Sequence, residues 1–495
     1  MMSWKLPIVK AIASLTVLIL LHVAFLTKIP EKLSNILITK TTTATAANTL
    51  SFSGIPKITF KVSPTTSLFS SSSATVFRTQ HFPPSSVGNP KNVEWPLNAV
   101  LPPSYTLTHE ISRVVTVSKT GKRRKPLSDA KIEEFLFGIA TTPERIEPNI
   151  EIWASWLQVA EGRRISPALV VSLDQAVQFD EIQQKSKETV IASAQRLNLD
   201  IRFHPTEISR YEQRVLFLVR ELWNAASSKT KWFVIQDDDT VWMTQRALVE
   251  TASWYPDPLK NSIVIGAESE SNTWRFGHIA YGGGGIIMSR HLVERMNRDG
   301  VLEECYTTFE EIFGGDGILS HCIAAVTKKA LEEIIMYNDA LHQMDFGGTA
   351  AFFFEAAPLV TSMHHWNTWF TLFPQTTLSA PNNFASALLL TRVARLIGYE
   401  NLSRRFVMEG GAFVVHVGYS VVFYKSHITN IELVPDTEWK YYNSKAYALV
   451  EGQDKVSYFI ADVKVAEDGS GDVVMQYRNS NGDELDVVWS APKTM

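Results

Sequence analysis

A run of three aspartates directly after an apolar segment is the feature that most constrains this chain. Residues 232–236 read WFVIQ, which is typical of a buried β-strand, and Asp237-Asp238-Asp239 follows without a break. Three adjacent carboxylates repel one another, and the repulsion costs most beside a dry strand. A divalent cation relieves it, and oxygen ligands suit magnesium or manganese. An acidic helix cap or a solvated turn is the alternative.

The two outer aspartates of the triplet are expected to act together. Side chains alternate along an extended backbone, so Asp237 and Asp239 point to the same side. One of them can then bind a metal while the other binds a ribose or sugar hydroxyl.

The residues around the triplet alternate between strand-like and helix-like runs. Strands are predicted at 135–140, 168–173, 201–203 and 232–236, and helices at 150–159 and 211–223. Several strands end at polar residues, among them Thr141 and Asp174. This order predicts an α/β fold with a largely parallel sheet, in which ligands bind at the carboxyl ends of the strands.

Four consecutive glycines at 282–285 are the second candidate feature. No Gly-Lys-Ser/Thr follows them and the GxGxxG spacing is absent, so neither a P-loop nor a dinucleotide fingerprint is present. Without Cβ atoms, residues such as Gly283 and Gly284 let the backbone approach a ligand closely or adopt positive φ. A flexible turn is the alternative.

Two later segments carry a carboxylate and a histidine pair. Asp316 lies between glycines, and we expect it to be exposed and free to act as a general base toward a substrate hydroxyl. His364 and His365 offer imidazoles that can complete a carboxylate metal site. A solvated turn aspartate and a structural histidine are the alternatives.

Composition excludes several classes of protein. The formal net charge of −4 lacks the basic surplus of a nucleic-acid binder. With only two cysteines, Cys305 and Cys322, a disulfide scaffold and a four-thiolate zinc site are both excluded. One disulfide between them remains open, because it depends on the compartment.

The two ends of the chain differ from its centre. An apolar segment at 6–26 can cross a bilayer as a retained signal-anchor, and the Ser/Thr/Pro-rich residues after it predict a flexible stem. Strand-like runs with Gly/Asn/Asp turns near the C-terminus predict a mainly β module. The expected parts are a tip and transmembrane helix at 1–27, a disordered stem at 28–130, an α/β domain at 131–409 and the β module at 410–495.

Taken in order, these motifs resemble the Fringe-like glycosyltransferases of family 31. That group includes Fringe, the mucin core β-1,3-galactosyltransferases and, most similar here, plant Fringe-like proteins of unassigned function. The similar blocks are WFVIQDDDTVW at 232–242, GAESES at 266–271, AYGGGGIIMS at 280–289, FGGDGILSHC at 313–322, HQMD at 342–345, APLVTSMHHW at 357–366 and VHVGYSVVF at 415–423. The resemblance covers about residues 131–430 and is strongest at 231–374.

The resemblance implies a GT-A fold and roles for individual residues. A Mn²⁺ or Mg²⁺ ion would be held by Asp239, Asp237 and His364, with His365 as the alternative histidine. Asp316 would be the catalytic base, and Cys305 and Cys322 would form a disulfide. By the same resemblance, Thr141, Arg145, Asp237 and Asp238 would contact the donor. Asp174 is expected there because it lies at a strand end, and Gly283 and Gly284 because their backbone can approach a ligand closely.

The activity implied is inverting transfer from a UDP-sugar donor to a glycan or glycoprotein acceptor, by family habit through a β-1,3 bond. The protein would be a single-pass type II membrane protein of the Golgi with its catalytic domain in the lumen. Fringe usually carries a second acidic residue where this chain has Gly317. That departure leaves a non-catalytic, glycan- or nucleotide-sugar-binding protein as the rival. A metal-dependent phosphoesterase is the weaker rival, because such enzymes usually group more ligands around two metals.

Overall fold

The computed structural model describes residues 57–63, 107–111, 130–157, 169–174, 181–374, 383–408, 413–424, 449–452 and 455–490. The predicted transmembrane helix at 6–26 and most of the predicted stem lie outside these residues. Among the helices that are described, none combines the length and the apolar character needed to cross a bilayer.

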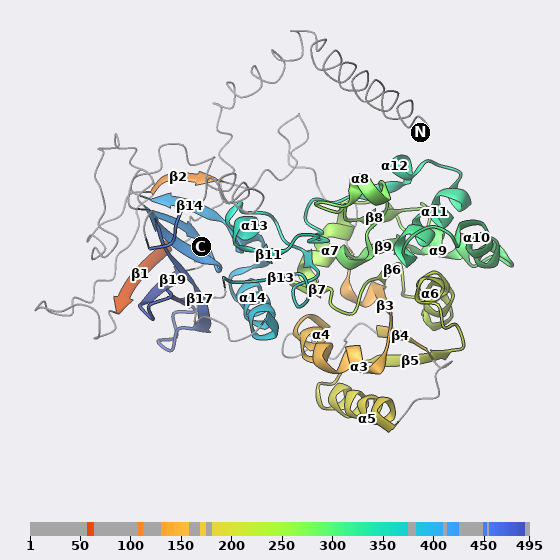
Figure 1. The fold of residues 1–495 in the computed structure, drawn as a ribbon, viewed down its shortest axis with the longest axis horizontal. Helices are drawn as coiled ribbons and strands as arrows, with labels where there is room; N and C mark the ends of the chain where they lie inside the picture. Colours follow the sequence, from red (N-terminus) through yellow and green to blue (C-terminus); the bar gives the residue numbers. More distant parts are fainter. Residues whose placement is uncertain are drawn as a thin grey trace, which may run out of the picture. The chain divides into compact units, whose positions relative to one another are not determined.

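A seven-stranded mixed sheet forms the centre of the α/β part (Figure 1). Its order is β10-β8-β9-β6-β3-β4-β5. The strands are β3 (Phe135–Thr141), β4 (Leu169–Asp174), β5 (Ile201–Thr206), β6 (Trp232–Ile235), β8 (Val264–Gly266), β9 (Ile286–Ser289) and β10 (Ile335–Tyr337).

The sheet is parallel except at one strand. β5, β4, β3 and β6 run parallel to one another, as predicted, whereas β9 runs antiparallel to both β6 and β8. The prediction of a largely parallel sheet is therefore confirmed, with β9 as the antiparallel strand. Ile286, the first residue of β9, pairs with Ile235, the last residue of β6. This reversal places the glycine run beside the end of the strand that carries the aspartates.

Helices cover both faces of the sheet because consecutive residues of its strands are apolar, so apolar side chains point to either face. In β3, Leu136 and Ala140 belong to one buried cluster, and Phe135, Phe137 and Ile139 to another. The first cluster contains residues of α6 (Tyr211–Ala225), and the second contains Trp153 and Trp156 of α4 (Ile150–Leu157). The predicted helices at 150–159 and 211–223 are thus confirmed.

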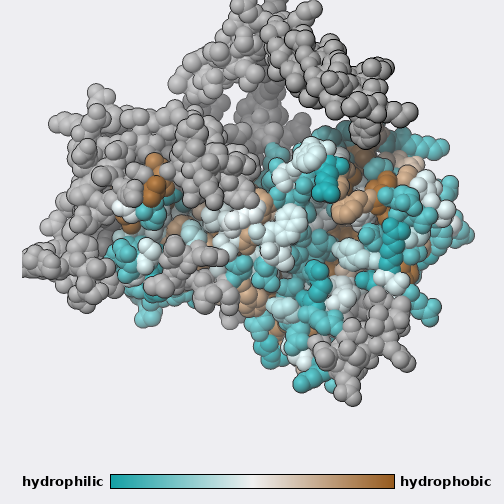
Figure 2. All heavy atoms as spheres, in the orientation of Figure 1, coloured by the Kyte–Doolittle hydropathy of each residue, from teal (hydrophilic) through white to brown (hydrophobic). Residues whose placement is uncertain are grey.

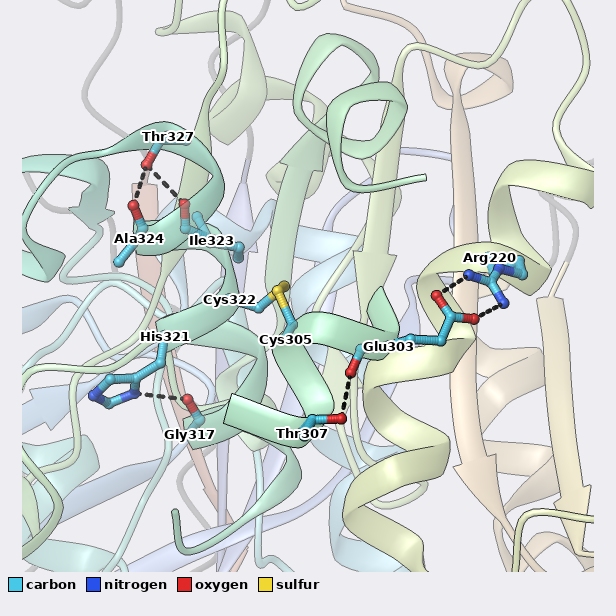
Figure 3. Close-up of a disulfide and its surroundings, with 10 residues drawn as sticks. All are labelled: Arg220, Glu303, Cys305, Thr307, Gly317, His321, Cys322, Ile323, Ala324 and Thr327. Atoms are coloured by element: carbon cyan, nitrogen blue, oxygen red, sulfur yellow. Dashed lines mark hydrogen bonds and ion pairs between the residues drawn. A yellow bond between two sulfur atoms is a disulfide. The ribbon is translucent and has the colours of Figure 1, made fainter. Parts of the chain in front are cut away.

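The remaining α-helices are α3 (Pro143–Ile146), α5 (Glu181–Arg196), α7 (Gln245–Ser253), α8 (Thr273–Phe276), α9 (Arg290–Met296), α10 (Val301–Phe309), α11 (Gly315–Thr327), α12 (Leu331–Ile334), α13 (Ala351–Glu355) and α14 (Asn383–Ile397). Cys305 of α10 and Cys322 of α11 form a disulfide, as the resemblance implied (Figure 3). Arg220 of α6 also binds Glu303 of α10 through two contacts of 2.7 and 3.0 Å. These links hold α11, which carries Asp316, against the rest of the domain.

The C-terminal part is an antiparallel sheet of eight strands, in the order β1-β19-β18-β17-β16-β15-β14-β2. Its strands are β1 (Lys57–Ser63), β2 (Leu107–Ile111), β14 (Arg405–Met408), β15 (Phe413–His416), β16 (Ser420–Tyr424), β17 (Lys455–Val465), β18 (Val473–Arg478) and β19 (Glu484–Ser490). The mainly β character predicted for this region is confirmed.

Two expectations about this sheet need correction. It begins at Arg405, ahead of the boundary predicted at 410, and both of its edge strands come from the predicted stem. The stem prediction is wrong at β1 and β2, because composition averaged over a long Ser/Thr/Pro-rich stretch conceals short strand-forming runs such as KITFKVS. On the face in Figure 2, apolar residues of the described part form small patches among hydrophilic ones.

Candidate active site

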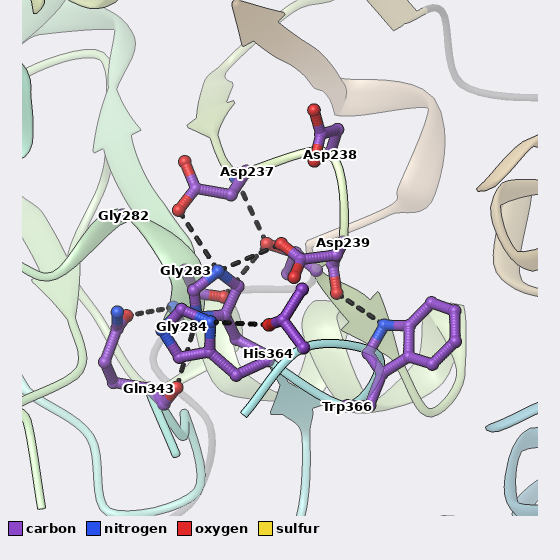
Figure 4. A network of polar contacts seen from close by, with 12 residues as sticks. Asp237, Asp238, Asp239, Gly282, Gly283, Gly284, Gln343, His364 and Trp366 are labelled. Atoms are coloured by element: carbon purple, nitrogen blue, oxygen red, sulfur yellow. Dashed lines mark hydrogen bonds and ion pairs between the residues drawn. The ribbon is translucent and has the colours of Figure 1, made fainter. Parts of the chain in front are cut away.

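Three chain segments meet at the carboxyl end of β6. The aspartate triplet follows β6 and leads into β7 (Val241–Trp242). β7 pairs antiparallel with β12 (Ser362–Met363), and this pairing brings His364 beside the triplet. The third segment is the glycine run, which precedes β9. Residues that are more than 100 positions apart in the chain therefore lie together (Figure 4).

His364 lies between the two outer aspartates. Its Nε2 atom is 3.0 Å from Asp239 Oδ1 and 3.2 Å from Asp237 Oδ2. Its Nδ1 atom is 3.2 Å from the carbonyl oxygen of Gln343. A carbonyl oxygen only accepts, so Nδ1 carries a proton and Nε2 is the atom that faces the carboxylates.

The electrostatics of this cluster are those of a cation site. Burial alone would lower the pKa of His364, but Asp239 and Asp237 raise it well above its ordinary value. Burial alone would raise the pKa of Asp239, but His364 brings it down to about 2. A proton on Nε2 is thus held by two carboxylates, in a position that a metal ion can take instead.

The middle aspartate points away from this cluster (Figure 4). Asp238 binds Arg145 through two contacts, Nε–Oδ2 at 2.6 Å and Nη2–Oδ1 at 2.7 Å, and accepts a hydrogen bond from the Thr141 hydroxyl. Its pKa is raised because burial outweighs the attraction of Arg145. Thr141 and Arg145, predicted to contact the donor, are therefore brought to the triplet. The Arg145 side chain is 63% exposed, so it also faces solvent there.

Asp174, also predicted to contact the donor, is the last residue of β4. Its side chain lies outside the part of the chain that the structure describes, so its contact with a donor remains a prediction.

The glycines let His364 and its neighbours approach closely. A Cβ atom on Gly283 would lie 2.2 Å from His364 Nδ1, and one on Gly284 would lie 2.4 Å from the Cβ atom of Ala267. The carbonyl of Gly283 accepts a hydrogen bond from Thr240 Oγ1 at 2.9 Å, and Gly284 N donates to Gln343 Oε1 at 3.0 Å. In this structure both glycines pack against protein atoms, and their contact with a donor remains a prediction.

Asp316 is the second residue of α11 and lies across Gly282 from the triplet. Its Oδ2 atom accepts from Gly282 N at 3.1 Å, and its Oδ1 atom accepts from Gly317 N at 2.9 Å. The expectation that flanking glycines leave it exposed is wrong, because Asp316 is half-buried. Burial, opposed by the Gly282 N–H, raises its pKa to about 6. A carboxylate of that pKa is ionised at neutral pH and is a stronger base than an ordinary one.

Sequence patterns did not reveal three residues that support the cluster. The Tyr211 hydroxyl donates to Asp237 Oδ1 at 3.0 Å, and partial burial together with Asp237 raises the pKa of Tyr211 well above its ordinary value. Trp366 Nε1 donates to the carbonyl of Asp239 at 2.6 Å, and Gln343 contacts both His364 and Gly284. Tyr211 starts α6 and carries no signal of its own. Gln343 and Trp366 lie inside the blocks HQMD and APLVTSMHHW, which could have indicated them.

His365 belongs to a neighbouring network. Its Nε2 atom is 3.2 Å from Asp345 Oδ1, and its ring stacks on Trp369 with centroids 3.9 Å apart. Asp345 also accepts a hydrogen bond from the Ser269 hydroxyl. Ligand atoms of Asp239, His364 and His365 nevertheless lie within 4.8 Å of one another. His365 therefore stays the alternative histidine ligand.

Comparison with known proteins gives limited similarity. Residues 271–485 match the model of a family described as "Protein of unknown function, DUF604", which is less than half of the chain. No curated protein matches.

Among solved structures, the chain is similar to a mannosyltransferase, PcManGT from Pyrobaculum calidifontis, in complex with GDP-Man and Mn²⁺. That likeness has 15% identity, covers 54% of this chain and 70% of that one, and has a TM-score of 0.29. Mouse xyloside xylosyltransferase 1 in its apo form is 12% identical, with 47% of this chain and 96% of that one covered and a TM-score of 0.28. An active-site mutant of LgtC is also 12% identical, with 46% of this chain and 86% of that one covered and a TM-score of 0.30. Likenesses of this size assign neither a fold nor an activity, and the Fringe-like resemblance remains a prediction.

Proposed function

We propose that this protein is a metal-dependent, inverting glycosyltransferase with a GT-A catalytic domain. It would move a sugar from a UDP-sugar donor to a hydroxyl of a glycan or glycoprotein acceptor. The observation that carries the proposal is His364 Nε2, held 3.0 and 3.2 Å from Asp239 and Asp237 at the end of a buried strand. Asp316, a carboxylate with a raised pKa, faces the same glycine run.

The residues of the cluster fit a divalent cation. Asp237 and Asp239 offer two carboxylates, and the proton on His364 Nδ1 leaves Nε2 as the ligand atom. Mg²⁺ prefers oxygen ligands alone, whereas Mn²⁺ also accepts an imidazole, so Mn²⁺ is the better match. When bound, such an ion supplies positive charge that stabilises the diphosphate leaving group.

Asp316 supplies the proton transfer in this scheme. Its carboxylate takes the proton of the acceptor hydroxyl while that oxygen attacks the anomeric carbon from the side opposite the diphosphate. The α-linked donor becomes a β-linked product, and the resemblance suggests a β-1,3 bond. The N–H groups of Gly282 and Gly317 orient the carboxylate. They also lower its pKa against the effect of burial, so that it is ionised at neutral pH. Arg145, with its exposed guanidinium beside the triplet, is placed to meet the nucleotide.

The absence of an acidic neighbour at Gly317 has a local explanation. A Cβ atom at this position would lie 3.0 Å from Ile312 Cγ2, and the residue is buried. An acidic side chain would therefore have to displace Ile312. The packing at Gly317 gives no specific support to the rival interpretation of a non-catalytic binding protein.

We also propose a Golgi location with a single type II anchor at 6–26 and the catalytic domain in the lumen. The Cys305–Cys322 disulfide supports an oxidising compartment, because disulfides are rare where glutathione keeps thiols reduced.

Binding of Mn²⁺ in the presence of UDP tests the proposal. We expect electron paramagnetic resonance to show bound Mn²⁺ in the wild-type protein and in Asp316→Asn, and to show its loss in His364→Ala. His291→Ala is the matched control, because His291 lies on α9 and bonds to Ser262 away from the cluster. Equal Mn²⁺ binding in His364→Ala and His291→Ala would contradict the assignment.

A further inference from the structure

An exposed aromatic side chain lies close to Asp316 in the chain and has no part in the metal cluster. Phe313, three residues before Asp316, is 71% exposed. The ring of Phe313 stacks on that of Phe276, with centroids 4.7 Å apart and planes only 10° from parallel. Phe276 thus covers one face of Phe313 and leaves the other face to solvent. We call Phe276 and Phe313 the aromatic face.

The aromatic face is tied to Asp316 from two directions. Along the chain, Phe313 and Asp316 are three positions apart, so their Cα atoms are at most about 11 Å apart. Through space, Tyr281 donates a hydrogen bond to the carbonyl of Gly277 at 3.1 Å, next to Phe276. Tyr281 directly precedes Gly282, whose N–H binds Asp316. The aromatic face is therefore held in place relative to the proposed base.

We propose that the aromatic face binds the acceptor, and that the acceptor presents a pyranose ring at this position. The inference rests on the proposed function, because Asp316 must take its proton from an acceptor hydroxyl. A pyranose has flat sides that consist of C–H groups, and such a side packs well on the free face of Phe313. A sugar bound there would carry its hydroxyls toward Asp316.

The exposed groups fit a sugar better than an apolar protein surface. Phe313 offers a flat aromatic surface, and the guanidinium of Arg275 lies over Phe276 at 4.9 Å. Arg275 is exposed, so N–H groups lie at the rim where sugar hydroxyls need partners. A contact with another protein would instead favour a broad apolar area.

Saturation-transfer NMR with methyl pyranosides and disaccharides tests the proposal, with glycerol as the polyol control. We expect the strongest transfer at the ring C–H protons of one side of a bound pyranoside. Phe313→Ala should weaken that binding about tenfold, whereas Phe313→Trp, which keeps a flat ring, should restore it. Trp254→Ala is the matched control, because Trp254 is also exposed, at 43%, but follows α7.

Manganese-dependent release of UDP from the donor, with no acceptor present, is measured on the wild type as a separate readout of the proposed function. Pyranoside binding that is absent in the wild type, or unaffected by Phe313→Ala, would overturn the inference while UDP release upholds the proposed function. Binding without UDP release would reject the transferase, and with it the assignment of the bound sugar as an acceptor. A Phe313→Ala variant that changes only the oligomeric state would assign this surface to a protein contact and overturn the inference.

Discussion

Replacement of Asp316 by asparagine should separate its cost in stability from its role in activity. A carboxyl group whose pKa rises from 3.8 to about 6 on folding destabilises the folded state by about 3 kcal/mol once it is ionised. Below the unfolded pKa both states are protonated and the cost is absent. It grows as the pH rises and is complete above the folded pKa. Asparagine never ionises, so Asp316→Asn does not carry this cost.

The difference in unfolding free energy between Asp316→Asn and the wild type should therefore depend on pH. The wild type carries about 1.6 kcal/mol of the cost at pH 5 and about 3 kcal/mol at pH 8, so the difference should grow by about 1.4 kcal/mol over this range. Asparagine accepts only one of the two backbone hydrogen bonds, which costs about 1 kcal/mol at every pH. Urea unfolding at both pH values, without divalent cations, measures the change.

The ionisation of Asp316 that lowers stability at higher pH should raise activity. The wild-type value of kcat/KM should fall as the pH drops through about 6, where Asp316 becomes protonated. Asp316→Asn should lose a factor of about 10² to 10⁴ in transfer while it still binds Mn²⁺ and UDP. A stability difference that is the same at pH 5 and pH 8 would refute the raised pKa. Near wild-type turnover in a folded Asp316→Asn variant would refute its role as the base.

Three further perturbations follow from the geometry of the site. Gly283→Ala places a Cβ atom 2.2 Å from His364 Nδ1 and should weaken Mn²⁺ binding more than tenfold. Gly282→Ala, whose Cβ atom would meet nothing closer than 3.6 Å, should leave Mn²⁺ binding unchanged. Isothermal titration calorimetry compares the two variants, and equal affinities would contradict the packing at Gly283. Tyr211→Phe removes the hydrogen bond to Asp237 and should lower Mn²⁺ affinity by a factor of about 3 to 10, while Tyr306→Phe, which loses only a contact with Arg210, serves as control. Removal of the disulfide in the double variant Cys305→Ala/Cys322→Ala should lower the free energy of unfolding by about 3 kcal/mol, since the bridged residues are 17 apart; a change below 1 kcal/mol in urea unfolding would show that α10 and α11 do not need the link.

Part of this architecture could be predicted because local patterns agree with the fold. The apolar strand before the triplet, and the apolar face of the helix at 211–223, are strong periodic signals, and β6 and α6 appear where they were expected. Asp237 and Asp239 both contact His364, as their predicted same-side orientation requires. The extended backbone on which that prediction rests is wrong, because β6 ends at Ile235 and a turn follows, in which Thr240 N donates to the carbonyl of Asp237 at 3.2 Å.

The rest depends on contacts between distant segments, which a local pattern does not contain. The reversed direction of β9 is defined by its antiparallel pairing with β6 and β8. Its short apolar run would look the same in a parallel strand, so the sequence does not predict the direction. The half-buried state of Asp316 comes from its packing against Gly282, 34 positions away. Tyr211 contacts Asp237 because the first turn of α6 lies beside the triplet. A tyrosine at the start of a helix has no sequence spacing that predicts such a contact.

The proposed transferase activity is tested by measuring the release of UDP from a panel of UDP-sugars with the full-length protein. With Mn²⁺ present, we expect slow hydrolysis of at least one UDP-sugar, its loss on chelation of the metal, and its loss in Asp239→Asn. Saturable binding of UDP-sugars without any release of UDP would contradict the claim of transferase activity, and cleavage of a phosphomonoester in the same assay would replace it with a phosphoesterase.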